Sequence, residues 1–430
     1  MLRKIIIFCL LTAILLPLIL LKLALAPSPL VTQSRTPDSA AAQQTKLLLK
    51  DSWKVLKQDR QAELTVRIEE LNAAAAFVGR GAAFLAGQFA LENQTLHSNV
   101  SLKIPSTPFG EYLNLGVTIL PSEQGLKLAS CSIGQLKIPG SVALWSAETV
   151  LNLLGDEQLG SRLLATVENL TFGDDRLHVT FRSGAEFGRL KNRLLAVLKG
   201  FLRQQSSDYE LQRTGYYLQL LDKLNRQPTK LQPSLGQIIP PLFRKVEKES
   251  QNRSPQEENR AALTALSIYL GGWEFHRLSR YLLNPPTPFP RNSKSRFLLA
   301  GRNDLRQHFL VSAGIKLLSD VRIGFAVGEF KELLDANPGG SGFSFIDLAA
   351  DRSGLWFAER ATASEQGARK FQRQLVSLTG EREFFPDFRD LEEGLSEKNF
   401  IDRYGNIDSI RYQEVVELID QRLSQLSLYQ

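Results

Sequence analysis

Alternation of apolar and polar residues between Gln88 and Ile138 constrains the fold of this chain more than any other feature. Successive side chains of a β-strand point to opposite faces of a sheet, so a strand with one buried face alternates in this way. The alternating runs are Phe89-x-Leu91, Val100-x-Leu102-x-Ile104, Leu113-x-Leu115-x-Val117-x-Ile119 and Leu126-x-Leu128, with breaks at Pro105, Pro108, Pro121 and Gly125. The runs predict an antiparallel sheet of long strands.

The segments on either side predict helices and further strands. Leu64, Val66 and Ile68 alternate as a strand does, and residues 69–86 are rich in alanine and predict a helix. Helices are also predicted from near residue 46, over 141–154 and over 157–166. Residues 167–172 and 177–181 predict a β-hairpin around the turn Gly173-Asp174-Asp175. Together these elements predict an α+β sheet domain over residues 47–185.

Alternation largely ceases after Phe181, and the apolar residues then recur at helical spacing. A chain of 430 residues is long enough for two domains of ordinary size. The predicted fold class is therefore α+β, with an N-terminal membrane anchor, an antiparallel-sheet domain with helices, and a mostly helical domain over 186–430. Within the helical domain, residues 227–258 contain Pro, Gln and Ser and predict a connector. A final helix is expected over 412–426.

The N-terminus predicts a membrane segment. Arg3 and Lys4 precede an uncharged apolar run from Ile5 to Leu21, which suits either a signal-peptide core or a short membrane span. Ala24-Leu25-Ala26 resembles a cleavage site, but Pro27 would oppose cleavage there, which favours an uncleaved anchor over residues 1–26. Basic residues before the span place the N-terminus in the cytoplasm. We therefore expect a single-pass inner-membrane protein with its bulk in the periplasm.

Residues 27–46 are rich in Pro, Ser, Ala and Gln and predict a flexible linker. The two cysteines are Cys9, inside the apolar run, and Cys131, so no intramolecular disulfide is expected in spite of an oxidising compartment. Stability must then come from burial of a core.

Much of the net charge of +7 is concentrated in one region, residues 189–253, which holds 13 Lys and Arg against 5 Asp and Glu. The predicted helix 186–205 is amphipathic and basic, which fits contact with anionic lipid or an anionic glycan. The alternative is a core-facing helix with a solvated basic face. Nucleic acid is not an expected partner, because the N-terminus predicts export and no nucleic-acid-binding module is present.

The densest group of chemically capable side chains lies in 302–360, where three helical patterns follow one another and Pro338 to Gly342 predict a turn. His308 falls on an apolar stripe, so it projects from a buried face. Asp347 and Asp351, four residues apart, share a face with small residues that permit close helix packing. Glu329 and Glu332, three apart, lie beside another apolar stripe. We predict that His308 approaches one of these carboxylates to within about 6 Å, roughly one solvent-bridged contact.

Each of these residues also has a structural interpretation. Ser344 and Asp347 fit a capping box at the start of a helix. Asp351 precedes Arg352, and Glu329 and Glu332 flank Lys331, so ordinary ion pairs are open to all of them. A single histidine on an apolar face is commonly a hydrogen-bonded core residue.

The spacing of polar residues in 302–360 resembles a known family. The residues that carry the likeness are His308-Phe309, Ser312-Ala313, Gly328-Glu329-x-Lys331-Glu332-x-x-Asp335, Gly340-Ser341-Gly342-x-Ser344, Asp347 and Asp351-x-x-Gly354. The pattern is similar to the YfiM-like predicted bacterial lipoproteins and, more loosely, to VanZ-like proteins. The likeness implies a helical envelope domain with a candidate site and no defined reaction. The N-terminal half weakly resembles YpmS-like and AsmA-like envelope proteins.

Several standard chemistries are excluded, because the sequence has no P-loop, no nucleophile elbow of the G-x-S-x-G type, no H-E-x-x-H motif and no cysteine cluster for zinc. What remains is acid–base or hard-metal chemistry at His308, Glu329, Glu332, Asp347 and Asp351. No cofactor is required by the sequence. Two functions stay open: a protein that binds or hydrolyses envelope polysaccharide or peptidoglycan, and a non-enzymatic lipid-binding or scaffold protein of the envelope.

Overall fold

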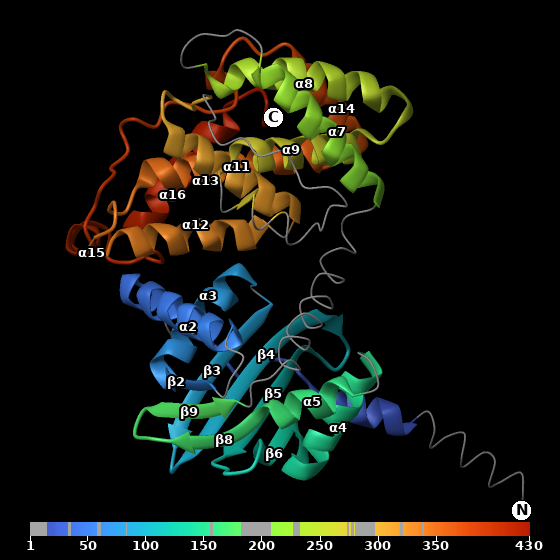
Figure 1. The fold of residues 1–430 in the computed structure, drawn as a ribbon, viewed down its shortest axis with the longest axis vertical. Coiled ribbons are helices and arrows are strands. Elements are labelled where there is room, and N and C mark those ends of the chain that lie inside the picture. Colours follow the sequence, from blue (N-terminus) through green and yellow to red (C-terminus); the bar gives the residue numbers. More distant parts are fainter. Residues whose placement is uncertain are drawn as a thin grey trace, which may run out of the picture. The chain divides into compact units, whose positions relative to one another are not determined.

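The computed structural model describes residues 15–32, 36–57, 62–82, 84–154, 158–181, 208–226, 233–272, 275–276, 279, 297–318, 321–337 and 339–430. The chain divides into two compact units, Met1–Val197 and Leu198–Gln430. The first combines antiparallel sheets with helices and the second is mostly helical, which confirms the α+β class (Figure 1). The predicted basic helix 186–205 lies outside the described residues.

The first unit contains a large antiparallel sheet built from the alternating runs. Its strand order is β3-β4-β5-β6-β7, and a short β1 pairs with β5. The bounds are β1 Leu25–Ala26, β3 Leu85–Glu92, β4 Thr95–Thr107, β5 Gly110–Leu120, β6 Lys127–Ile133 and β7 Leu136–Pro139. Consecutive strands pair because the connections are tight. Between β3 and β4, Asn93 and Gln94 both adopt positive φ, as a two-residue turn that matches the strand twist requires.

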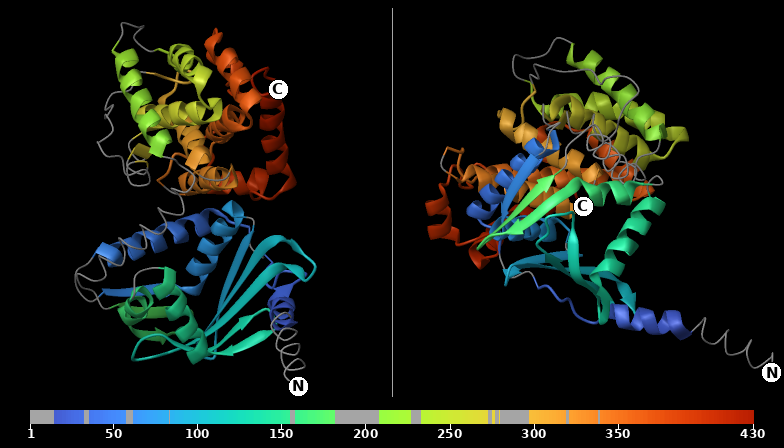
Figure 2. Two further views of the ribbon diagram at one scale, coloured as in Figure 1. Left: turned by 90° about the vertical axis from the view of Figure 1, so that its right-hand side faces the viewer. Right: turned by 60° about the horizontal axis from the view of Figure 1, so that its bottom comes forward.

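A second, three-stranded antiparallel sheet has the order β2-β9-β8. It consists of β2 Ala62–Arg67, β8 Val167–Phe172 and β9 Arg176–Phe181. The helices of this unit are α2 Ser39–Lys57, α3 Ile68–Gly81, α4 Gly140–Leu154 and α5 Leu159–Thr166. Packing of α2 on α3 and of α3 along β3 is visible in Figures 1 and 2. The side chain of Asn72 joins α3 to this edge strand, since it both donates to and accepts from the backbone of Phe89 at 2.8 Å.

Two predicted boundaries in the first unit were wrong. Helix α2 begins at Ser39 rather than near Lys46, because Asp38 accepts a hydrogen bond from the amide of Ala41 at 2.7 Å and so caps the helix. The predicted linker 27–46 is therefore helical from residue 39, and Val31 within it is buried and donates its amide to Ser101. The alanine-rich helix ends at Gly81 rather than Ala86, because Leu85 already belongs to the β3 edge strand.

The N-terminal segment is described from residue 15, and residues 15–24 are helical. The amide of Gln135, in the turn between β6 and β7, donates to the carbonyl of Leu23 at 2.8 Å. The end of this helix is thereby attached to the sheet. Among the helices that the structure describes, none combines the length and the apolar character needed to cross a bilayer.

The second unit packs its helices around one large core. Its elements are α7 Asp208–Asn225, α8 Leu235–Glu249, α9 Pro255–Leu270, α11 Asn303–Leu318, α12 Val321–Asp335, α13 Phe345–Thr362, α14 Glu365–Val376, α15 Glu397–Tyr404 and α16 Ile410–Ser424. Helix α9 is buried along most of its length and contacts α7, α11 and α13 (Figure 1). The predicted connector 227–258 was wrong, because it contains α8 and the start of α9. Pro240 and Pro241 fit inside α8, where most side chains are buried in the core.

A buried ion network joins α7 to α9. Glu258 is 0% exposed, and its carboxylate accepts hydrogen bonds from Tyr209 at 2.6 Å, from Tyr217 and from the Arg213 guanidinium at 2.9 Å. Arg213 also binds Glu249 at 3.0 Å. Because every oxygen of a buried carboxylate needs a donor, the network supplies this charge with the partners that water would otherwise provide.

The burial of Glu210, also on α7, predicts that the stability of the helical unit depends on pH. Burial raises its pKa to about 7, although Arg260 lies 3.8 Å away. In the unfolded chain the Glu210 carboxyl loses its proton near pH 4.5. The stability that its protonated form contributes is therefore fully present below that pH and is lost as pH rises through about 7. We expect the free energy of unfolding of Glu210→Gln to exceed that of the wild type by about 3 kcal/mol at pH 7.5 and by little at pH 4.5. Urea unfolding followed by circular dichroism measures this, with exposed Glu359→Gln as the control; a constant difference across pH would contradict it.

Candidate functional site

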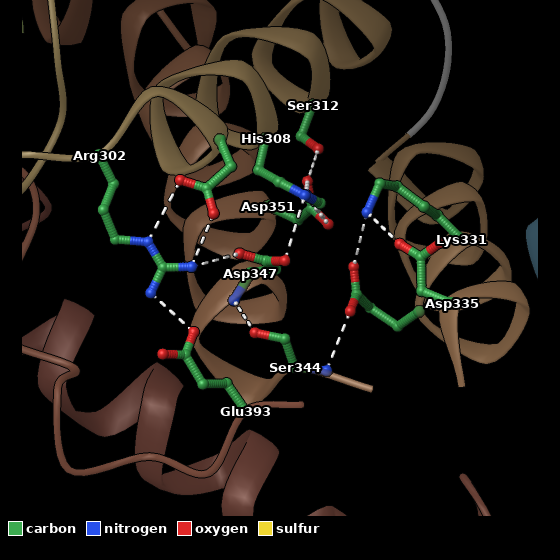
Figure 3. Close-up of polar contacts among 11 residues, drawn as sticks. Arg302, His308, Ser312, Lys331, Asp335, Ser344, Asp347, Asp351 and Glu393 are labelled. Carbon is green, nitrogen blue, oxygen red and sulfur yellow. Dashed lines mark hydrogen bonds and ion pairs between the residues drawn. The ribbon is translucent and has the colours of Figure 1, made fainter. Parts of the chain in front are cut away.

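The candidate site is formed by three helices that contact one another, α11, α12 and α13. His308 projects from α11, Glu332 from α12, and Asp347 and Asp351 from successive turns of α13, as Figure 3 shows for the labelled members. All four residues are buried. The turn before α13 allows this arrangement, because Gly339 and Gly342 adopt φ of +89° and +88°, a region that favours glycine.

His308 lies between the two aspartates. Its Nδ1 is 3.2 Å from both carboxylate oxygens of Asp351, and its Nε2 is 3.5 Å from Oδ2 of Asp347. The hydroxyl of Ser312, one turn further along α11, donates to Oδ1 of Asp351 at 2.6 Å. The predicted closeness of His308 to a carboxylate is therefore confirmed, and both ring nitrogens are engaged (Figure 3).

The predicted capping box at Ser344 is only half formed. The Ser344 hydroxyl accepts the amide of Asp347 at 3.0 Å, as an N-cap does. The reciprocal bond is made by another helix, because the amide of Ser344 donates to Oε2 of Glu332 at 3.0 Å. The Asp347 carboxylate therefore takes no part in the cap, and it points between Arg302 and His308 (Figure 3). Its Oδ1 makes no hydrogen bond within the described part of the chain and lies 3.7 Å from Arg302.

Glu332 and Glu329 have different surroundings although both are 0% exposed. Glu332 faces His308 and Asp351, and Lys331 donates to its Oε1 at 3.2 Å. Lys331 also reaches Asp335 at 2.7 Å, toward the solvent side. Glu329 accepts a hydrogen bond from Tyr412 of α16 at 2.7 Å and so links α12 to α16. The structure therefore groups Glu332, and not Glu329, with His308.

Burial and neighbouring charges shift the pKa values in this cluster. Burial opposes the charged form of His308, but the charge and hydrogen bond of Asp351 and the charge of Asp347 outweigh it and raise its pKa to about 9. Burial raises the pKa of Glu332 to about 8, against the opposing effect of Lys331. Burial also raises the pKa of Asp347, while His308 and Lys331 act against it. His308 and Glu332 therefore each hold a proton near neutral pH.

Small residues make this close approach of the three helices possible. A Cβ atom on Gly354 would lie 2.0 Å from the carbonyl oxygen of Phe309, so the small stripe of α13 packs against the backbone of α11. Gly328 of α12 accommodates the Asp351 side chain of the same α13 face, whose Oδ2 would lie 2.8 Å from an added Cβ. Both glycines allow neighbouring helices to approach closely, which brings the side chains of the candidate site together.

Three contributors, Ser312, Lys331 and Arg302, were not among the predicted site residues. Ser312 stands four residues after His308, a spacing that places both on one helix face and could have identified it. Lys331 adjoins Glu332 in sequence. Arg302 precedes α11 and approaches Asp347 only through the tertiary fold, so the sequence gave no signal for it. Its guanidinium also pairs with Asp304 at 2.7 Å and with Glu393 at 2.6 Å.

Comparison with known proteins found no matching family model, no matching curated protein and no matching solved structure. The resemblances to YfiM-like, VanZ-like, YpmS-like and AsmA-like proteins stay predictions. What can be said about function therefore depends on the buried His308, Glu332 and Asp351 group in the helical unit and on the residues around it.

Proposed function

We propose that this chain is a cell-envelope hydrolase whose helical unit activates water at the cluster around His308. The observation that supports this is the position of the imidazole, between Asp351 on one side and Asp347 on the other. Buried charges of this kind cost desolvation energy, and apolar residues of similar volume would stabilise a helical core as well or better. A group of ionisable side chains in such a setting is a candidate for chemistry rather than for stability.

The contacts suggest a separate role for each residue. Asp351, held by Ser312, positions the His308 ring through Nδ1. Asp347 stands on the other side of the ring, next to partly exposed Arg302, and its Oδ1 has no hydrogen-bond donor among the described residues. A carboxylate oxygen with free lone pairs can accept a proton from water. Asp347 is thus the proposed general base, and His308 and Asp351 are positioning residues.

Envelope polysaccharide or peptidoglycan is the proposed substrate, and the inner membrane the proposed location. Arg3, Lys4 and the apolar run that follows support a single-pass orientation with both units in the periplasm. Glycosidic bonds in that compartment are cleaved by carboxylic side chains that transfer protons and activate water. The cluster holds carboxylates of this type.

Replacing Asp347 by asparagine tests the proposal. We expect Asp347→Asn to lower the release of soluble fragments from purified peptidoglycan by at least about 100-fold, since a positioned general base contributes that much or more. Asp335→Asn is the matched control, because Asp335 is also a carboxylate beside Lys331 but lies outside the contact with His308. The urea midpoints of both variants show whether they fold. Full activity of a folded Asp347→Asn protein would rule out this role.

A second candidate function is lipid contact without catalysis, and one observation favours it. Helix α4 exposes large apolar side chains, with Trp145 66% and Leu153 79% exposed. Tryptophan is common where a protein meets the membrane surface. If the wild-type protein releases no fragments from peptidoglycan and Trp145→Ser with Leu153→Ser abolishes vesicle binding, the non-enzymatic candidate is the better one.

A further inference from the structure

Carboxyl groups outnumber basic groups around His308 in the described part of the chain. Six carboxylates are connected through the contacts of this region, against two permanently charged bases, Arg302 and Lys331, and the imidazole itself. The carboxylates are Asp304, Glu332, Asp335, Asp347, Asp351 and Glu393. Glu332, Asp347 and Asp351 are buried, and like charges repel strongly where water is excluded. A bound cation would relieve this repulsion.

We propose that His308, Glu332 and Asp351 bind one divalent transition-metal ion. One ligand atom from each of the three residues lies within 4.8 Å of the other two, and all three residues are buried. That spacing suits donors arranged around a single ion at about 2.0–2.2 Å. The three ligands come from α11, α12 and α13, so the ion would cross-link three helices of one core.

The remaining contacts of each candidate ligand match those of ligands in metal sites, where a second partner orients the donor. Nδ1 of His308 faces Asp351, while Nε2 faces Asp347 at 3.5 Å, so the ring can present Nδ1 to the ion and donate its other N–H to Asp347. Ser312 donates to Asp351 at 2.6 Å. The amide of Ser344 donates to Glu332 at 3.0 Å. Each donor is therefore held before any ion arrives.

Asp347 lies on the Nε2 side of the ring, where its Oδ1 is 3.7 Å from Arg302, so it serves as the partner of Nε2 rather than as a ligand. The donor set of one imidazole and two carboxylates suits zinc, manganese or iron(II) better than magnesium, which is rarely bound by imidazole, or copper(I), which prefers thiolate and thioether donors.

The ion site goes beyond the proposed hydrolase, because an ion could be bound here without any turnover. The ion would lie on the Nδ1 side of the His308 ring, and the proposed base Asp347 lies on the Nε2 side. Ion binding at one end of the ring and water activation at the other are therefore separate properties, which different measurements test.

Titration of the metal-stripped full-length protein with Zn²⁺ and Mn²⁺ by calorimetry tests the site. We expect one ion per chain. Glu332→Gln and Asp351→Asn should each weaken binding by at least about 100-fold, and Asp347→Asn, which removes only an orienting partner, by about 10-fold. The control is Glu329→Gln, because Glu329 lies one turn away on α12, is equally buried and binds Tyr412 instead. Glu329→Gln should bind as the wild type does.

Two outcomes would overturn the site: no binding of either ion by the wild-type protein at millimolar concentration, or unchanged binding in both ligand variants. If the ligand variants fail to fold, the visible spectrum of Co²⁺ added to the wild type decides, because bands expected for nitrogen and oxygen ligands support the site and a spectrum of hydrated Co²⁺ rejects it. Ion binding without peptidoglycan turnover would support the site and count against the hydrolase. Turnover without ion binding would do the reverse.

Discussion

Replacing Arg213 by methionine is expected to destabilise the helical unit by about 3–5 kcal/mol, because it leaves the charge of Glu258 buried without its cationic partner. Glu258 is 0% exposed, and the guanidinium contacts its carboxylate through both Nε and Nη2. The two tyrosines that also bind Glu258 supply hydrogen bonds but no positive charge. Methionine keeps most of the volume of the arginine stem, so the loss reports the charge rather than a cavity.

The double variant Arg213→Met with Glu258→Gln separates this cause from others. Glutamine removes the charge and keeps the shape, so it should restore part of the stability lost in Arg213→Met. Urea unfolding followed by circular dichroism at 222 nm, where helix dominates the signal, measures the difference. If the double variant is no more stable than Arg213→Met, the uncompensated charge of Glu258 is not the cause.

Replacing Gly354 by alanine is expected to cost about 3 kcal/mol and to separate α11 from α13 locally. The new Cβ would lie 2.0 Å from the carbonyl oxygen of Phe309 and 3.1 Å from the amide nitrogen of Ala313. Both obstacles are helix backbone, which cannot turn aside as a flexible side chain can. Since His308 and Asp351 sit on these two helices, the substitution should also weaken any ion binding at the candidate site.

Gly215→Ala is the matched control for this prediction. Gly215 lies inside α7, and nothing lies within 4 Å of a Cβ added there. Alanine favours the helix over glycine by about 1 kcal/mol, so this variant should be slightly more stable than the wild type. Thermal unfolding of the wild type, Gly354→Ala and Gly215→Ala measures the order of their stabilities. Equal stability of Gly354→Ala and the wild type would mean that α11 and α13 are not in backbone contact.

Local sequence determined the sheet strands and most helices, for a physical reason. Strands with one buried face alternate with a period of two, and tight turns need particular residues, so β4, β5, β8 and β9 follow from the sequence. The ends of some helices depended on tertiary and capping contacts, which the spacing of apolar residues does not reveal. Asp38 starts α2 earlier than the apolar spacing suggests. Pro240 and Pro241 indicated a connector, but burial of the apolar face of α8 outweighed that signal.

The same division applies to the candidate site. Helical spacing by itself placed His308 on an inward face and Asp347 and Asp351 on one side of α13, because residues four apart stand one above the other. Only the tertiary structure decided that Glu332, rather than Glu329, joins them, since the rotation of α12 about its axis is set by its packing against α13 and α16. It also decided that the amide of Ser344 binds Glu332, which leaves the Asp347 carboxylate facing His308. Long-range packing and charge–charge interactions in a buried region act between residues distant in sequence, and local periodicity carries no information about them.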